Sequence, residues 1–425
     1  MGITRRNVLK ATAAGAVLGG IGLPRAGVRA ATKTVKIGFL APLTGEVSAW
    51  GLPGLYGCEV LVKGINEKGG VKIGEDTYTL ELASFDDEYL PDKALQGFKK
   101  LVSEEDVKFV MMLGGDPWPG VQRFANQSKM LATTLLPSDL SPDTPYLLAP
   151  CEVHPIYNVT GVDYLARKYP EAKKAVICAQ NDSLGIPSVA TYEAAFEAAG
   201  IEIVDINIFD PATTDFAPIV TSLMAKKPDI FCYDTAYADF VNLIAQQLHS
   251  QGYKGLQISC TCDNYPQIVE KTSKEFMEGF IFQFPDFDDP KLNESFINFP
   301  EPNKFFGDYN KTHPGTWTAV SWEYPSIVLQ WITGAQLAGS IEPMAVLEAM
   351  KSKPTWPHIY GEADWWGKDL WGVDNALVGN WPVVVIRDGK AVIEEYGSIP
   401  AWWAKHKDLM VKYMRGRKQM WDQRA

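Results

Sequence analysis

The chain has 425 residues, of which 46% are hydrophobic, and its formal net charge at pH 7 is −11. This length is typical of two domains, and the apolar fraction is sufficient for two hydrophobic cores. The acidic balance argues against nucleic acid as a partner, because phosphates require a basic surface.

The first thirty residues have the pattern of an export signal and not of a folded element. The paired arginines Arg5 and Arg6 precede an Ala-, Gly- and Leu-rich run at 11–23, and a small-x-small cleavage pattern ends at Ala30. Paired arginines indicate the twin-arginine type of signal. The alternative is a basic start before a membrane anchor, but the run is short and rich in glycine. We therefore expect residues 1–30 to be a signal peptide, cleaved near Ala30 to release a periplasmic protein.

Four strands are predicted in the next part of the chain, at 35–40, 78–86, 107–113 and 131–136. Helices lie between them, and a polar loop at 44–51 separates the first strand from its helix. This β-α alternation with short loops predicts a parallel, doubly wound α/β sheet. Such sheets bind ligands at the carboxyl ends of their strands, which places the loop at 44–51 in a candidate site.

A second α/β set follows Pro150. Its strands are expected at 175–179, 201–208, 228–233, 256–260 and 279–284, and its helices include 153–167 and 237–251. Further along, a long helix is predicted at 315–339, a shorter one at 344–350, and a hairpin at 383–386 and 391–395.

Two segments near the C-terminus have an unusual composition. Residues 361–382 hold four tryptophans, which we interpret as structural packing of an inserted loop. Residues 402–425 interleave seven basic residues with aromatic and apolar ones. Such a tail is either a membrane-surface or partner-binding helix, or an amphipathic helix packed on its own lobe.

The six cysteines are an even number in an exported chain, so disulfides are possible. A twin-arginine substrate folds in a reducing compartment, however, which weakens that expectation. The pair Cys260 and Cys262 has the wrong spacing for a zinc knuckle. We expect neither a structural metal nor a cofactor.

Several segments resemble the periplasmic substrate-binding proteins of the branched-chain amino-acid ABC importers, the leucine-binding-protein type. They are KIGFLAPLTGEVSAWGLPGLYGCEV, FDDEYLPDKALQGFKKLV and VKFVMMLGG, and the resemblance covers roughly residues 35–397 in order. It implies the type I fold, in which two doubly wound parallel-sheet lobes are joined by a multi-strand hinge. Lobe 1 would comprise 31–150 and 286–379, lobe 2 would comprise 151–285 and 380–399, and 400–425 would be the basic tail.

The resemblance also implies a function. The protein would capture a small ligand by lobe closure and deliver it to the membrane permease of an ABC importer, acting as a monomer. The alternative is a ligand-sensing subunit that feeds a receptor or kinase partner.

Carried over residue by residue, the resemblance places ligand contacts in the strand-end loops of both lobes. The candidates are Ser48, Trp50, Asp116, Trp118, Pro119, Ser138, Ser183, Leu184, Tyr237, Cys262 and Asp263. Trp118 stands near where the family has a small hydroxyl residue, and Leu184 replaces its usual tyrosine. These departures favour an apolar or aromatic carboxylate, an amide or an amino acid over a plain leucine-type ligand. An amine also fits, through cation–π contacts and Asp116 or Asp263.

An enzyme is not expected. The chain after the signal has no G-x-S-x-G elbow, P-loop, H-E-x-x-H or G-x-G-x-x-G motif, and its five histidines fall at unrelated spacings.

Overall fold

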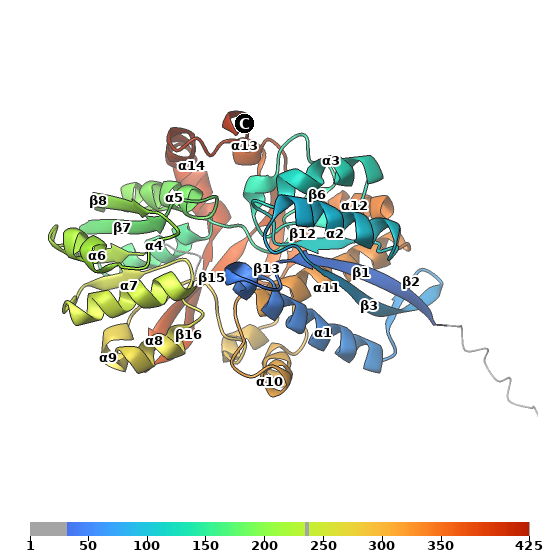
Figure 1. Ribbon diagram of the computed structural model, residues 1–425, viewed down its shortest axis with the longest axis horizontal. Coiled ribbons are helices and arrows are strands. Elements are labelled where there is room, and N and C mark those ends of the chain that lie inside the picture. The colour runs from blue at the N-terminus through green and yellow to red at the C-terminus, as the bar shows by residue number, and fades with distance from the viewer. Residues whose placement is uncertain (1–31, 234–237, 425) are drawn as a thin grey trace, which may run out of the picture. The chain divides into compact units, whose positions relative to one another are not determined.

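Two β-sheets organise the computed structural model, which describes residues 32–233 and 238–424 (Figure 1). The signal sequence predicted at 1–30 lies outside the described residues. Thr32–Ala425 forms one compact unit, in which each sheet is the centre of its own lobe. In the described part of the chain, no helix is both long enough and apolar enough to cross a membrane.

The first lobe contains a six-stranded sheet in the order β2-β3-β1-β4-β5-β6. Its strands are β1 Lys33–Ala41, β2 Val71–Ile73, β3 Asp76–Asp86, β4 Val110–Met112, β5 Ala132–Thr133 and β6 Leu147–Leu148. All neighbouring pairs are parallel except β2 with β3. The inner strand β1 is buried from Ile37 to Ala41, as expected for a parallel strand covered on both faces.

Helices cover both faces of this sheet. They are α1 Leu52–Glu67, α2 Pro91–Ser103, α3 Trp118–Ser128, α10 Pro302–Thr312, α11 Val320–Ala338 and α12 Pro343–Lys351, with short 3₁₀ turns η1 Glu46–Trp50 and η2 Pro137–Asp139. Helices α1 and α11 pack closely. A Cβ added at Gly57 would lie 2.0 Å from the carbonyl oxygen of Ser321, so this approach requires glycine. The contact fixes the first turn of α11, which carries residues of the site described below.

The second lobe contains a seven-stranded sheet in the order β16-β15-β11-β10-β9-β7-β8. Its strands are β7 Lys174–Gln180, β8 Glu202–Phe209, β9 Ile230–Cys232, β10 Leu256–Ile258, β11 Ile281–Phe282, β15 Asn380–Arg387 and β16 Lys390–Ser398. Its helices are α4 Asn158–Lys168, α5 Gly185–Ala198, α6 Ala217–Met224, α7 Ala238–Ser250, α8 Tyr265–Lys271, α9 Lys274–Met277 and α14 Ile399–Gly416. Strand β15 is antiparallel to its neighbour β11 and forms an antiparallel hairpin with the edge strand β16, whereas the other neighbouring pairs are parallel.

The chain passes between the sheets three times: after β6, after β11 and between β14 and β15. The second passage continues into η3 Pro290–Asn293. The third follows a small antiparallel sheet made of β12 Thr355–His358, β13 Gly361–Trp366 and β14 Ala376–Val378. The predicted fold, two doubly wound lobes joined by several strands, is therefore confirmed.

Local differences from the sequence prediction have physical reasons. The helix expected at 153–167 begins only at Asn158, because the preceding residues form turns closed by hydrogen bonds from Ile156 N–H to the Val153 carbonyl and from Asn158 N–H to the Pro155 carbonyl. The Trp-rich segment is not a loop, since it forms β13, the short helix α13 Lys368–Trp371, β14 and the start of β15. All six cysteines lie buried as thiols.

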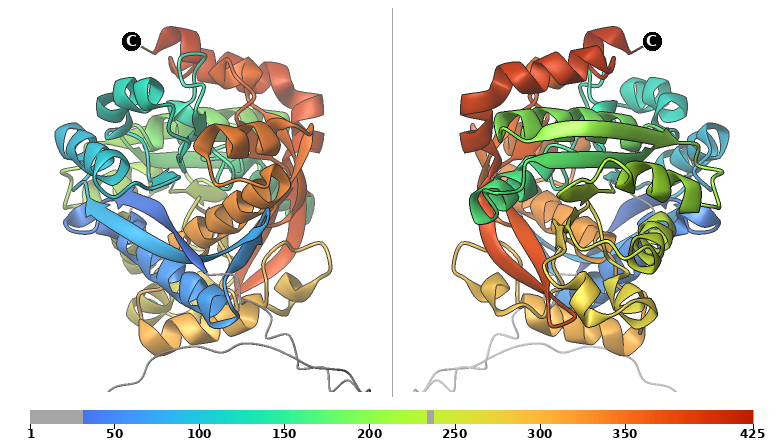
Figure 2. Two further views of the ribbon diagram at one scale, coloured as in Figure 1. Left: turned by 90° about the vertical axis from the view of Figure 1, so that its right-hand side faces the viewer. Right: turned by 90° about the vertical axis from the view of Figure 1, so that its left-hand side faces the viewer.

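The basic tail forms α14 and the short turn η4 Trp421–Gln423, and α14 packs along α5 (Figure 2). Arg417 makes two hydrogen bonds to the carboxylate of Glu193, at 2.9 and 2.8 Å. Lys412 donates to Glu197 at 2.7 Å. These contacts agree with the second interpretation of the tail, an amphipathic helix packed on its own lobe.

Candidate functional site

A cavity of about 650 Å³ is lined by strand-end loops of both lobes. The first lobe contributes η1 and the start of α1, which follow β1. The second contributes the starts of α7 and α8, which follow β9 and β10, and α10 with the segment before α11 completes the wall. Open α/β sheets hold ligands at this edge. The lining residues are Ser48, Ala49, Leu52, Pro53, Tyr56, Ala238, Asp239, Asp263, Asn264, Tyr265, Pro266, Gln267, Asp286, Phe306, Asn310, Gly315, Thr316, Trp317 and Thr318.

The charged groups of this lining are all acidic. Asp239, Asp263 and Asp286 face the cavity, and no lysine, arginine or histidine is among the described lining residues. Burial raises the pKa of Asp263 to about 7 and that of Asp286 to about 6. The Tyr265 hydroxyl donates to Asp286 at 2.7 Å. The cavity therefore combines negative charge with the rings of Tyr56, Tyr265, Phe306 and Trp317.

Two further carboxyls, those of Glu152 and Glu323, lie within electrostatic reach of Asp263. Glu152 lies on the first passage between the lobes and Glu323 in the first turn of α11. They are 3% and 0% exposed. Burial, together with the neighbouring Asp263, raises the pKa of Glu152 to about 8, although the hydrogen bond from Tyr157 opposes the shift. Burial, then Glu152 and Asp263, raise the pKa of Glu323 well above its usual range.

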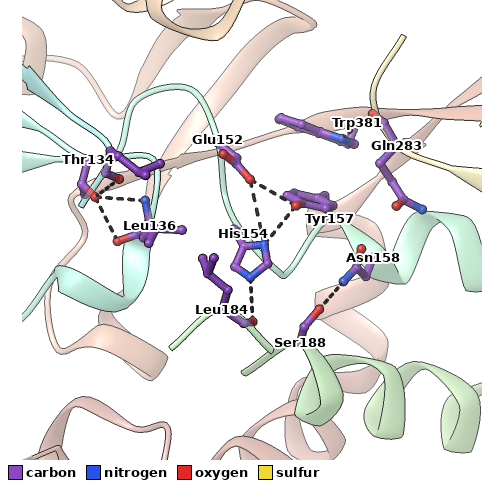
Figure 3. Close-up of polar contacts among 11 residues, drawn as sticks. Thr134, Leu136, Glu152, His154, Tyr157, Asn158, Leu184, Ser188, Gln283 and Trp381 are labelled. Carbon is purple, nitrogen blue, oxygen red and sulfur yellow. Dashed lines mark hydrogen bonds and ion pairs between the residues drawn. The ribbon is translucent and has the colours of Figure 1, made fainter. Parts of the chain in front are cut away.

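A chain of hydrogen bonds connects Glu152 to the second lobe (Figure 3). The Tyr157 hydroxyl lies 3.1 Å from Glu152 Oε1 and 3.0 Å from His154 Nδ1, and His154 Nε2 donates to the Leu184 carbonyl at 3.0 Å. Burial lowers the pKa of His154 to about 4, so the imidazole is neutral. The Tyr157 hydroxyl donates to Glu152, and the imidazole of His154 joins this hydroxyl to the Leu184 carbonyl.

Aromatic rings form a continuous wall from the cavity to this chain. Trp317 contacts Phe287 at 5.5 Å between ring centroids, and Phe287 stacks on Trp322 at 5.3 Å. Trp322 lies 6.2 Å from Trp381, which stacks on Tyr157 at 5.0 Å. Segments at or next to all three passages between the lobes contribute rings to this wall. The wall therefore lies in the interior of the region between the lobes.

The structure brings some of the sequence-predicted site residues to the cavity. Ser48 and Asp263 line it, whereas Trp50 and Trp118 are buried, at 9% and 3% exposure, and are not among its lining residues. Asp116 is exposed and lies within electrostatic reach of Asp182 in the second lobe.

None of the other predicted residues within the described chain is among those that line the cavity. Pro119 and Ser183 are exposed, Ser138 is half-buried, and Leu184 and Cys262 are buried. Tyr237 lies outside the described residues. The role of each of these residues in binding stays a prediction.

Sequence reasoning missed Glu152, Glu323, Asp286 and Trp317. A signal for Glu323 was present, because it is the lone acid in the apolar stretch VSWEYPSIVLQW. A buried helix that is apolar all round retains a charge only where a partner or a ligand meets it. Asp286 and Trp317 had no such signal, since tertiary contacts alone bring them to the cavity.

Comparisons with known proteins identify relatives in sequence and in fold. The chain is 28% identical over 224 residues to the Leu/Ile/Val-binding protein BraC3 of Rhizobium johnstonii, a match that covers 51% of this chain and 58% of that protein. The matched stretch thus spans little more than half the length of this curated relative.

Two solved structures share the fold over most of their length. A leucine-binding protein LivK of Thermotoga maritima has a TM-score of 0.68 at 17% identity, covering 86% of this chain and 99% of that one. A solute-binding protein from R. palustris in complex with 4-hydroxybenzoate has a TM-score of 0.68 at 18% identity, covering 87% and 99%. A family model described as periplasmic binding protein matches residues 34–391. The chain therefore belongs to the periplasmic binding protein family.

Proposed function

We propose that this protein is the extracytoplasmic solute-binding component of an ABC importer. It captures a small apolar or aromatic carboxylate, amide or amino acid between its lobes, delivers it to a membrane permease as a monomer, and carries out no chemical reaction. Export by the N-terminal signal, with cleavage near Ala30, would place it in the periplasm. The observation that carries the proposal is the cavity of about 650 Å³ lined by strand-end loops of both lobes.

Capture follows from this geometry. A ligand that touches both walls binds the closed arrangement more tightly than any open one, and it shifts the population of lobes towards closure by that difference in affinity. One contact between the walls already exists without ligand, because the backbone N–H of Ala319, before α11, donates to Asp263 of the second lobe. Closure therefore assembles a site that neither lobe holds alone.

A thermal-shift screen tests the proposal. Compounds of the carboxylate, amide, amino-acid and amine classes are added to the protein, and a ligand raises the melting temperature by mass action. Ala49→Trp fills the cavity from an exposed lining position and should abolish the shift without lowering the melting temperature of the ligand-free protein. Ala212→Trp, on an exposed turn after β8, is the matched control and should keep the full shift. A screen without any shift, or equal shifts in both variants, contradicts the proposal.

A further inference from the structure

The C-terminal segment, which consists of α14, η4 and Arg424, contacts both lobes. Its first part lies on the second lobe, where α14 packs along α5 and Lys412 donates to Glu197 at 2.7 Å (Figure 1). Its last residues reach the first lobe, at the carbonyl of Leu140. The segment therefore connects the two lobes in addition to the three passages of the chain between the sheets.

Hydrogen bonds fold η4 back onto the end of α14. The guanidinium of Arg415 donates to the carboxylate of Asp422 at 3.3 and 3.2 Å, and the side chain of Gln423 donates to the Arg415 carbonyl at 3.1 Å. Met420, which lies between the two elements in the chain, is 3% exposed. Because η4 is fixed to α14 in this way, the end of the described chain belongs mechanically to the second lobe.

Two contacts attach this end to the first lobe. Arg424 Nη2 donates to the carbonyl of Leu140, directly after η2, at 3.0 Å. Trp421 lies against the turn after α13, because a Cβ added at Gly372 would lie 2.9 Å from the Trp421 ring and 2.8 Å from Pro142. This turn leads into β14, which is bridged to the residue that follows β6 in the first lobe.

The segment that Arg424 reaches belongs to the strand-end loops of the first lobe. The carboxylate of Asp139 accepts hydrogen bonds from the Thr134 hydroxyl at 2.7 Å and from the Gly115 N–H at 3.0 Å, which ties the loops after β5 and β4 together. Arg424 lies within electrostatic reach of Asp139, and a guanidinium stays charged in proteins. Strand-end loops face the other lobe, so they move away from it when the lobes open.

Acidic groups of the two lobes approach each other in the same region. Asp116, in the loop after β4, lies within electrostatic reach of Asp182 in the second lobe and of Asp139 in its own lobe. Like charges repel, which favours separation of the lobes. Arg424 opposes this effect, because it brings a positive charge from the C-terminal segment of the second lobe to Asp139 in the first.

We propose that the C-terminal segment is a clasp that holds the two lobes together. Helix α14 anchors it on the second lobe, Arg424 and Trp421 fasten it to the first, and opening of the lobes requires these two contacts to break. The clasp raises the population of the closed arrangement before any ligand binds, and it thereby reduces the shift that a ligand must still cause. The inference goes beyond the proposed capture function and concerns the ligand-free protein.

Distances between the lobes of the ligand-free mature protein test the clasp. Spin labels are attached to Gln96→Cys on α2 and Ala212→Cys after β8, two exposed positions, while the six native cysteines are buried. Pulsed electron paramagnetic resonance then gives the ratio of open to closed molecules, and we expect the labelled parent to be mainly closed. Arg424→Ala should raise this ratio at least about fivefold, because it removes a hydrogen bond from a charged group.

Two further variants separate the clasp from a general loosening of the segment. Arg417→Ala removes another arginine of the same segment, whose partner Glu193 lies on the second lobe, and it should leave the ratio unchanged. A stop codon at Trp421 removes both contacts with the first lobe and keeps α14, so it should open the lobes at least as much as Arg424→Ala. Circular dichroism checks that each variant is folded.

Each result decides about the clasp. An unchanged ratio in both Arg424→Ala and the shortened chain overturns the inference, and so does equal opening in Arg417→Ala or a parent protein that is already open. Opening in the shortened chain alone overturns the role of Arg424 and supports the contact of Trp421 as the fastening. Failure of the clasp leaves the capture function standing, because the thermal-shift screen tests capture separately.

Discussion

Carboxylates occur in two contrasting settings in this protein. On the outer face of the second lobe, Glu193 and Glu197 each contact a cation of the C-terminal segment, Arg417 and Lys412. Between the lobes, Glu323 is more deeply buried than either of them and has no such contact within the described residues. The ion pairs of the outer face hold α14 on α5, whereas burial without a cation raises the pKa of Glu323 well above its usual range.

The largest expected effect on stability comes from the aromatic wall that lies beside the buried carboxyls between the lobes. Trp381 is 1% exposed, stacks on Tyr157 and donates its indole N–H to the Gln283 carbonyl at 3.0 Å. Trp381→Ala should lower the free energy of unfolding by about 3–5 kcal/mol, measured by urea denaturation. Trp403, half-buried on α14, is the control, and its replacement by alanine should cost clearly less. A smaller loss at Trp381 than at Trp403 would show that the wall is not tightly packed.

The second effect is the pH dependence of the ligand-free protein. Burial raises the pKa of Glu152 to about 8 and the pKa of Asp263 and of Asp139 to about 7. An acid whose pKa is raised on folding binds more protons in the folded state, so its contribution to stability is lost as the pH rises towards that pKa. His154 and His358, with pKa values lowered to about 4, act in the opposite direction, but only below their unfolded pKa of about 6.5.

Between about pH 6.5 and about pH 8, the free energy of unfolding should therefore fall by about 3 kcal/mol. Urea denaturation at several pH values measures this slope. Glu152→Gln should flatten this slope, because Glu152 has the highest pKa among Glu152, Asp263 and Asp139. A stability that rises over this range, or a slope that Glu152→Gln leaves unchanged, would be at odds with a cluster lacking a cation.

The smallest effect on stability is expected for the ion pairs on the outer face of the second lobe. Arg417 is paired with Glu193 at a partly buried position, with side-chain exposures of 28% and 13%. A double-mutant cycle of Arg417→Ala and Glu193→Ala should give a coupling of about 1 kcal/mol, and ligand binding should not change. A coupling near zero would mean that apolar contacts alone hold α14 in place. A change in ligand affinity would instead link this surface to the cavity.

The sequence by itself determined the alternation of the main strands and helices and pointed to the family, but it missed β13, α13 and β14 in the Trp-rich segment. Strands such as 35–40 consist of a local run of apolar residues, and such a run can be recognised from the sequence alone. It also placed Ser48 and Asp263 in strand-end loops, and both line the cavity. The tertiary structure alone decided that Glu152, Asp263 and Glu323 meet, although 111 and 60 positions separate them along the chain. Their proximity depends on the crossing of the lobes and on the close packing of α11 against Gly57 of α1, and no local pattern encodes such long-range contacts.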